Sequence, residues 1–125
     1  MTHPNEKLLR SFDLANLEKM AEVLAVDFVW HYFNPKLPHL QGNYLGFEGL
    51  QDFFSKLGTE VHGTFTTKPV SVHPVGDELL AVQVKNTMRI EGETIAVDAL
   101  VVWRIVEGKI AEAWDIPAID HLASA

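Results

Sequence analysis

Residues 79–116 read LLAVQVKNTMRI-EG-ETIAVDALVVWRIV-EG-KIAEAWDI, and this stretch decides the fold. Three long runs, Leu79–Ile90, Thr94–Val106 and Lys109–Ile116, are rich in β-branched residues, which favour strands. The pairs Glu91-Gly92 and Glu107-Gly108 between them are typical of hairpin turns. The stretch therefore predicts an antiparallel meander of three strands.

The segments just before the meander predict a fourth strand and a helix. Phe65–Pro74 is strand-like, and because it contains Pro69 we expect it at a sheet edge or at a bulge. Phe47–Leu57 has apolar residues at helical spacing, with Phe53 on the apolar side. Gly58 is expected to end this helix.

The N-terminal part predicts helices followed by a short strand. A first helix is expected over Asn5–Arg10, and a second begins at an N-cap, Asn16, and continues to Ala25. Asp27–Phe33 is rich in strand formers, and Asn34–Gly46, with two prolines and two glycines, predicts a loop. Helices before a meander indicate an α+β fold, a single domain over residues 1–125, with a curved, mostly antiparallel sheet wrapped around N-terminal helices. A ligand would lie on the concave side of such a sheet.

Composition narrows the functional classes. The 125 residues carry ten Lys and Arg against seventeen Asp and Glu, a net charge of −7, which argues against a nucleic-acid partner. No apolar run reaches the length of about 18 residues that a membrane span needs, and the first residues resemble no signal peptide. We therefore expect a cytoplasmic domain with no membrane association.

Metal and cofactor chemistry find no support in the motifs. The chain has no cysteine, and its six histidines show neither His-x-His nor His-x-x-x-His spacing. Gly42 and Gly46 lie in a predicted loop with no Lys-Ser or Lys-Thr after them, which is not the pattern of a phosphate loop. We expect no metal site and no cofactor.

Several motifs together resemble one superfamily. They are Val29-Trp30-His31, Gly42-Asn43-Tyr44-Leu45-Gly46-Phe47-Glu48-Gly49, Phe53-Phe54, Gly63-Thr64-Phe65, and the stretch Trp103-Arg104-Ile105-Val106-Glu107-Gly108-Lys109-Ile110-Ala111-Glu112-Ala113-Trp114-Asp115. Their order resembles the nuclear transport factor 2-like (cystatin-like) superfamily, and more closely its SnoaL-like, ketosteroid-isomerase-related branch. This resemblance implies a cone-shaped sheet, an apolar small-molecule pocket and a homodimer through the outer sheet face. Because the fold hosts isomerases, polyketide cyclases, epoxide hydrolases and binding modules, it does not by itself give a function.

Asp115 is the first candidate for chemistry. A three-residue loop ending at Gly108 would set Ala99 opposite Asp115 and Val101 opposite Ala113, which turns Asp115 into an apolar row with Val101 and Trp103. A two-residue turn would instead turn Trp114 and Glu112 to that side. Burial in an apolar wall raises the pKa of a carboxyl group toward the range useful to a general acid or base. The resemblance makes Asp115 the counterpart of the acid/base aspartate of SnoaL-like cyclases; the alternative is a solvated aspartate at a strand end.

His31 and Tyr32 are the next candidates. By resemblance they lie where ketosteroid isomerases place their proton-transferring aspartate. Adjacent strand residues point to opposite faces, so only one of the two lines the pocket, and Tyr32 shares a side with Trp30. An imidazole is the usual proton shuttle near neutral pH, but a single histidine is also a common structural residue.

The remaining candidates line the pocket. A two-residue turn at Glu91-Gly92 sets Asn86 opposite Val97, where its amide either binds a carbonyl or hydroxyl of a ligand or bonds to a loop. The expected lining residues are Trp30, Phe53, Asn86, Val101 and Trp103.

Two functions remain open from the sequence. The isomerases' oxyanion-binding Tyr and Asp correspond by resemblance to positions near Leu8 and Val101, which carry neither hydroxyl nor carboxyl groups. Steroid-type isomerisation is therefore not expected. The first function is a cofactor-free acid/base enzyme of cyclase, isomerase or hydrolase type, with Asp115 transferring the proton; the second is a non-catalytic binding or interaction module.

Overall fold

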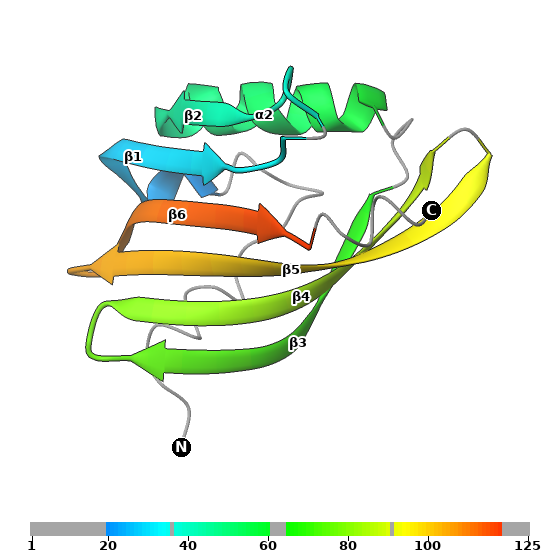
Figure 1. Cartoon of the computed structure of the whole chain (residues 1–125). Coiled ribbons are helices and arrows are strands. Elements are labelled where there is room, and N and C mark those ends of the chain that lie inside the picture. The colour runs from blue at the N-terminus through cyan, green and yellow to red at the C-terminus, as the bar shows by residue number, and fades with distance from the viewer. Residues whose placement is uncertain (1–19, 36, 61–64, 91, 119–125) are drawn as a thin grey trace.

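A computed structural model describes residues 20–35, 37–60, 65–90 and 92–118, and Figure 1 shows their arrangement. Within these residues the chain forms six strands and one α-helix. In chain order they are β1 (Leu24–Tyr32), β2 (Gly42–Leu45), α2 (Gly46–Glu60), β3 (Thr66–Val75), β4 (Leu79–Ile90), β5 (Glu93–Val106) and β6 (Lys109–Pro117). The expected α+β class with a curved, mostly antiparallel sheet is confirmed.

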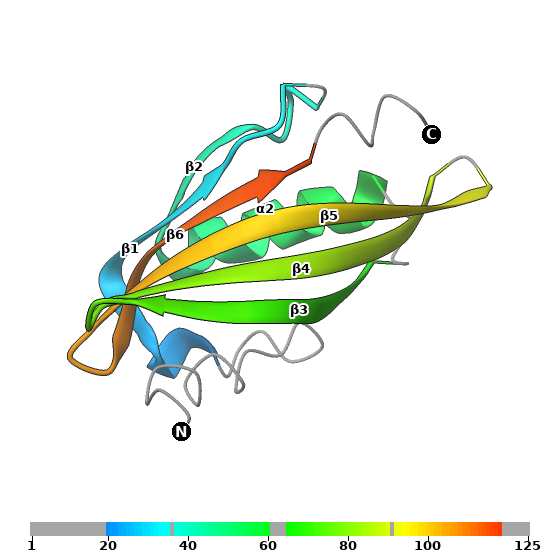
Figure 2. The ribbon, with the colours of Figure 1, turned by 60° about the horizontal axis from the view of Figure 1, so that its bottom comes forward.

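The six strands form one sheet in the order β2-β1-β6-β5-β4-β3. Every neighbouring pair is antiparallel except β1 with β6, which run parallel. Figure 2 shows α2 lying along one face of the curved sheet. We call this the inner face and the opposite side the outer face.

Alternation along the strands sets which side chains reach the inner face. On β5, Val97, Ala99, Val101, Trp103 and Ile105 are buried, while the residues between them are half-buried or exposed. Period-2 alternation of this kind is the pattern of a strand with one covered face. On α2, Phe53 is fully buried and its ring packs against the inner-face rings of β1 and β2.

The β5–β6 hairpin differs from the expectation in its turn. Val106 pairs with Lys109, so Glu107 and Gly108 form a two-residue turn in which both have positive φ (51° and 76°). The register then shifts between Ile105 and Arg104, because β6 inserts one extra residue, Ala111, as a bulge. Two corrections follow. Asp115 lies opposite Val101, not Ala99, and Ala113 lies opposite Trp103, not Val101.

The bulge keeps Asp115 on the expected side in spite of the shorter turn. A two-residue turn without it would carry Glu112 and Trp114 to the inner face. The extra residue shifts the inward and outward alternation of β6 by one position. Ala113 is therefore fully buried on the inner face, and Asp115, two residues later, also faces inward. The face predicted for Asp115 is therefore found, although the turn predicted to produce it was wrong.

The N-terminal half needs further corrections. The helix expected to continue to Ala25 does not do so: residues 20–22 form a short 3₁₀ turn, and β1 begins at Leu24, which pairs with Ile110. Pairing with β6 overrides the helical spacing there. The expected loop Asn34–Gly46 contains the strand β2, and the helix expected over Asn5–Arg10 lies outside the described residues.

The helix α2 and the edge strand β3 both form where they are expected, but α2 extends beyond its expected end. The helix of residues 47–57 is confirmed, but Gly58 lies inside α2, two residues before its end, instead of stopping it. The strand at Phe65–Pro74 is confirmed as the edge strand β3, with an irregular register between Pro69 and Ser71. Proline is tolerated at such a position because no ladder hydrogen bond is needed from it.

The two glycines of α2 provide a matched test of how this helix packs on β2. A Cβ at Gly49 would lie 2.7 Å from the backbone carbon of Tyr44, whereas one at Gly58 would meet nothing within 4 Å. We expect Gly49→Ala to destabilise the fold by about 1–3 kcal/mol through this clash. Gly58→Ala should stabilise it by about 0.5–1 kcal/mol, as is usual for alanine in place of glycine in a helix.

Urea denaturation of the two variants and the wild type measures both effects. Equal stability of Gly49→Ala and wild type would contradict the close approach of α2 to β2. Destabilisation by Gly58→Ala would contradict the placement of Gly58 within the helix.

Candidate functional site

Asp115 lies near the end of β6, on the inner face, beside buried apolar side chains. Its cross-strand neighbour Val101 is buried, as are Ala113 and Trp103. Asp115 as a whole residue is half-buried, but its Oδ1 atom is shielded from solvent and has no hydrogen-bond partner among the described residues. Burial raises the pKa of Asp115 from 3.8 to about 7, because an ionised carboxylate loses its water without gaining a partner. At neutral pH the group is therefore poised between its acid and base forms.

Tyr32 ends β1 directly beside Asp115. The parallel pairing of β1 with β6 makes Tyr32 and Asp115 register partners on the same face. Burial raises the pKa of Tyr32 to about 12, with a smaller contribution from the negative charge of Asp115. Tyr32 is therefore a neutral phenol that can donate a hydrogen bond but does not act as a base.

Asn34 orients the hydroxyl of Tyr32. Its side-chain Nδ2 donates to Tyr32 Oη at 3.0 Å, and Gln41 Oε1 accepts from its backbone N–H at 3.0 Å. Tyr32 Oη accepts this hydrogen bond through a lone pair, so its own O–H group is still able to donate to another acceptor. Asn34 is 1% exposed. Sequence reasoning missed it because it placed Asn34 at the start of a loop, and only tertiary packing buries it.

Aromatic rings cover the inner face next to Asp115 and Tyr32. The ring centroid of Trp30 lies 5.5 Å from that of Phe53 and 5.7 Å from that of Trp103. Phe53 also packs on Tyr32 at 4.8 Å. Trp30 Nε1 is buried and has no hydrogen-bond partner within the described part of the chain. The structure thus brings together Asp115, Tyr32, Trp30, Phe53, Trp103 and Val101.

Asn86 lies on the inner face of β4, farther from Asp115. It pairs with Val97, as the two-residue turn at residues 91–92 predicts. Its side chain is 9% exposed, and Oδ1 has no partner in the described residues. Of the two alternatives for this amide, a bond from a loop to its oxygen is not present among the described residues.

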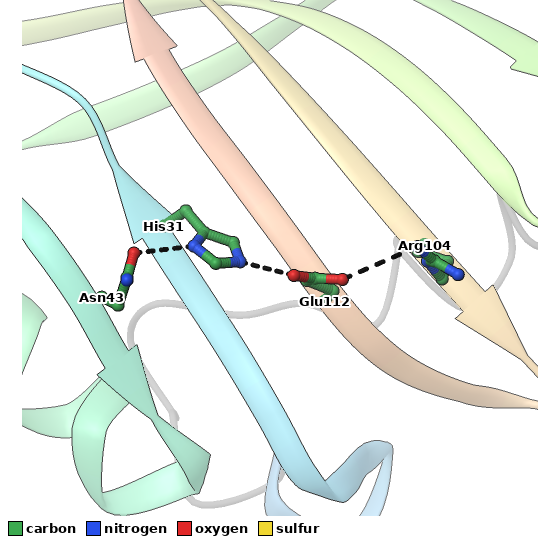
Figure 3. Close-up of polar contacts among 4 residues, drawn as sticks. All are labelled: His31, Asn43, Arg104 and Glu112. Carbon is green, nitrogen blue, oxygen red and sulfur yellow. Dashed lines mark hydrogen bonds and ion pairs between the residues drawn. The ribbon is translucent and has the colours of Figure 1, made fainter.

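His31 lies on the outer face, separated from Asp115 by the sheet. Its ring nitrogens contact Asn43 Oδ1 at 2.7 Å and Glu112 Oε2 at 2.5 Å, as Figure 3 shows. The ring also stacks on Trp114, with centroids 5.4 Å apart. Glu112 Oε1 lies 3.8 Å from Arg104 Nη2, which extends the network to β5. Of the two neighbouring candidates, Tyr32 faces Asp115 and His31 does not.

The polar network on the outer face, formed by His31, Asn43, Glu112 and Arg104, has the features of a structural contact between strands and not those of a reactive site. The side chains of His31 and Glu112 are 27% and 28% exposed, and that of Arg104 is 44% exposed. Ion pairs with this much exposure contribute about 0–1 kcal/mol each. Their role in this position is to tie β2, β1, β6 and β5 together.

Residues 20–35, 37–60, 65–90 and 92–118 hold no cluster of three or more His, Asp or Glu side chains that could bind a metal ion. No helix in this part of the chain is long and apolar enough to cross a membrane.

Comparisons with known proteins agree with this architecture. A family model of the SnoaL-like domain matches residues 6–113. No curated protein sequence matches the chain.

Solved structures share the fold at low sequence identity. An NTF2-like protein of unknown function from Burkholderia pseudomallei has a TM-score of 0.84 at 19% identity, covering 99% of this chain and 97% of its own. TerC, crystallised with polyporic acid, has a TM-score of 0.83 at 20% identity, with 97% and 96% covered. A protein from Jannaschia described as a candidate SnoaL-like polyketide cyclase has a TM-score of 0.76 at 15% identity, with 97% and 89% covered. At these identities the likeness shows the fold alone.

The burial of Asp115 predicts a specific pH dependence of stability. Its folded-state pKa of about 7 lies above the unfolded value of 3.8, so the native state binds the extra proton between these pH values. Stability from this group is present below about pH 4 and is lost as pH rises to about 7. We expect Asp115→Asn, which stays neutral, to match the wild type at pH 4 and to exceed its unfolding free energy at pH 8 by on the order of 4 kcal/mol.

Urea denaturation across pH 4–8 checks this difference, and NMR titration of the Asp115 carboxyl carbon gives its midpoint directly. Asp98→Asn, on the outer face of β5, controls for the loss of one negative charge from an acidic chain. A midpoint at or below 4 would mean that Asp115 is solvated or paired.

Proposed function

Because the chain belongs to the SnoaL-like domain family, we propose that it binds a small apolar or amphipathic molecule on its inner face and transfers a proton through Asp115. The observation that carries this proposal is the buried, unpaired Oδ1 of Asp115, whose pKa is raised to about 7 beside the neutral hydroxyl of Tyr32. Perturbed carboxyl groups in apolar surroundings are typical of general acid–base sites. The candidate cyclase from Jannaschia supports a reaction of this kind at the level of the fold.

The reaction that fits these two groups is proton abstraction next to a carbonyl. The Asp115 carboxylate takes a proton from the carbon beside the carbonyl, and the C–H bonding electrons move to the carbonyl oxygen as an enolate forms. The Tyr32 O–H donates a hydrogen bond to that oxygen, with Asn34 holding the hydroxyl in place. In a tautomerisation the protonated Asp115 returns the proton to a different carbon of the conjugated system. In an aldol-type cyclisation the enolate carbon first forms a bond to a second carbonyl carbon of the same molecule, the π electrons of that C=O bond move to its oxygen, and Asp115 gives its proton to the resulting alkoxide. No cofactor takes part in either reaction.

The surroundings favour this chemistry on the inner face. A carboxylate with few waters is a stronger base toward carbon than a solvated one, because its charge has lost the stabilisation by water. The buried rings of Trp30, Phe53 and Trp103 surround this part of the inner face with apolar groups, which keeps water away from the carboxyl group. The same carboxylate could also act as the base in a hydrolysis, where it would take the proton from a water molecule instead of from carbon.

A binding module is the second candidate. Val101, directly opposite Asp115, supplies no hydrogen-bond donor, and among the described residues the hydroxyl of Tyr32 is the donor that the strand register places directly beside Asp115. Oxyanion sites commonly use two donors, each contributing about 3–4 kcal/mol. This observation favours a ligand site without turnover, and the next experiment separates the two functions.

Hydrogen–deuterium exchange of 2-tetralone, an apolar bicyclic ketone, tests the proposed proton transfer without a known substrate. We expect the protein in D₂O to accelerate exchange of the protons beside the carbonyl, as followed by NMR. Asp115→Asn should reduce the acceleration by about 10²- to 10⁴-fold, the range for a general base. Tyr32→Phe should reduce it less, because the base remains.

The matched control is Asp98→Asn, which removes a carboxylate from the outer face of β5 and should exchange like the wild type. Binding of 2-tetralone with no accelerated exchange would favour the binding module. Acceleration that survives Asp115→Asn would contradict the role given to Asp115.

We further propose that two copies of the chain associate through the outer face. Leu100 and Ile116 are cross-strand partners there, and each remains 42% exposed. Neighbouring charges on Glu112 and Arg104 are already engaged within the chain, which lowers the cost of covering them. A second copy would bury this apolar pair against itself, as a two-fold interface requires.

Light scattering at micromolar concentration tests the association. We expect a mass of twice the monomer's 14.0 kDa for the wild type. Leu100→Asp should give the monomer mass, because it introduces a charge at the centre of the interface. Thr94→Asp, at an exposed position of the same face six residues away on β5, should not. A wild-type mass of 14.0 kDa would contradict the proposal.

A further inference from the structure

Asn86 presents a hydrogen-bond acceptor on the inner face that the proton transfer at Asp115 does not use. The residue is 9% exposed, and its Oδ1 has no partner among the described residues. A buried polar atom without a partner costs about 1–3 kcal/mol, so the sequence would be more stable with an apolar residue there. An amide that is kept in such a position is suited to a donor that arrives with a ligand.

The register shows how far Asn86 lies from Asp115. Asn86 pairs with Val97 and Asp115 pairs with Val101, so the two positions are offset by four residues along β5. Strand geometry converts this offset into about 13 Å along the strands and about 10 Å across the two strand spacings between β4 and β6. The two polar positions therefore lie at separate places on the inner face.

The surface between the two positions is apolar. On β5 the inward residues Val97, Ala99 and Val101 are 2%, 4% and 7% exposed, and none has a polar side chain. At the Asp115 position, Tyr32 and Trp30 add a hydroxyl and an unpaired Nε1–H. The inner face thus carries two polar positions joined by a dry strip of small aliphatic side chains.

We infer that the ligand is an elongated molecule with polar groups at both ends of an apolar body. One end carries the oxygen that meets Tyr32 and Asp115, and the other carries a hydroxyl or N–H group that donates to Asn86 Oδ1. This inference rests on the proposed binding site and names the class of molecule that it takes. A donor at the far end selects ligands because its absence leaves Asn86 unpaired in the complex as well.

Two rigid probes of equal length separate the contribution of the far-end donor to binding from that of the apolar body. Binding of 4,4′-dihydroxybiphenyl and of 4-hydroxy-4′-methylbiphenyl, which lacks one donor, is followed by isothermal titration calorimetry. We expect the wild type to bind the diol about five- to tenfold more tightly, the effect of one net hydrogen bond. In Asn86→Leu the two probes should bind equally. Gln83→Leu, an exposed amide on the outer face of the same strand, should keep the wild-type preference.

The thermal midpoint of Asn86→Leu separates a ligand contact from a structural role. An unpaired amide predicts a midpoint equal to or above that of the wild type, and a large decrease would overturn the inference by showing that Asn86 bonds within the chain. Equal binding of the two probes by the wild type would overturn the inference while leaving the proposed function intact. Failure of both probes to bind would overturn the inference and the proposed binding site together.

Discussion

The one extra residue in β6 is the constraint on which the arrangement of this protein depends. Ala111 lies between Ile110, which pairs with Ile105, and Glu112, which pairs with Arg104. Because side chains alternate along a strand, this insertion decides which half of β6 faces inward. With the bulge, the carboxylate of Asp115 faces the covered side of the sheet and that of Glu112 faces the outer side. Without it the two would exchange surroundings.

Because β1 pairs in parallel with β6, the inward or outward orientation of the β6 residues also determines that of their partners on β1. Tyr32 pairs with Asp115 and His31 pairs with Trp114, so the two adjacent residues of β1 are sorted onto opposite faces. The phenol then shares a buried face with the raised-pKa carboxyl group, while the imidazole joins a half-exposed ion-pair network. The groups of the proposed proton transfer and the ion-pair network therefore lie on opposite faces of the sheet.

Much of this arrangement follows from local sequence, and the rest depends on contacts that local sequence does not specify. The three long strands and the helix at Phe53 were predictable because their period and turn residues extend over many positions. The bulge was not, since a turn of either length fits Glu107-Gly108 and only pairing with β5 distinguishes them. The strand β2 has four residues and no pattern of its own, and Leu24 follows helical spacing but pairs with Ile110 instead. Asn34 gave no signal, because its importance comes from a hydrogen bond to Tyr32 and from burial.

The unpaired polar atoms of the inner face lower the stability of the fold. Trp30 Nε1, Asn86 Oδ1 and Asp115 Oδ1 are buried without partners in the described part of the chain, each at about 1–3 kcal/mol. Their sum is comparable to the net stability of about 5–15 kcal/mol that an ordinary domain has. A chain under selection for stability alone would replace such groups by apolar ones of similar size, and each replacement would raise stability. A bound molecule that pairs these atoms removes the penalty in the native state only, so the same groups that weaken the empty fold couple ligand binding to its stability.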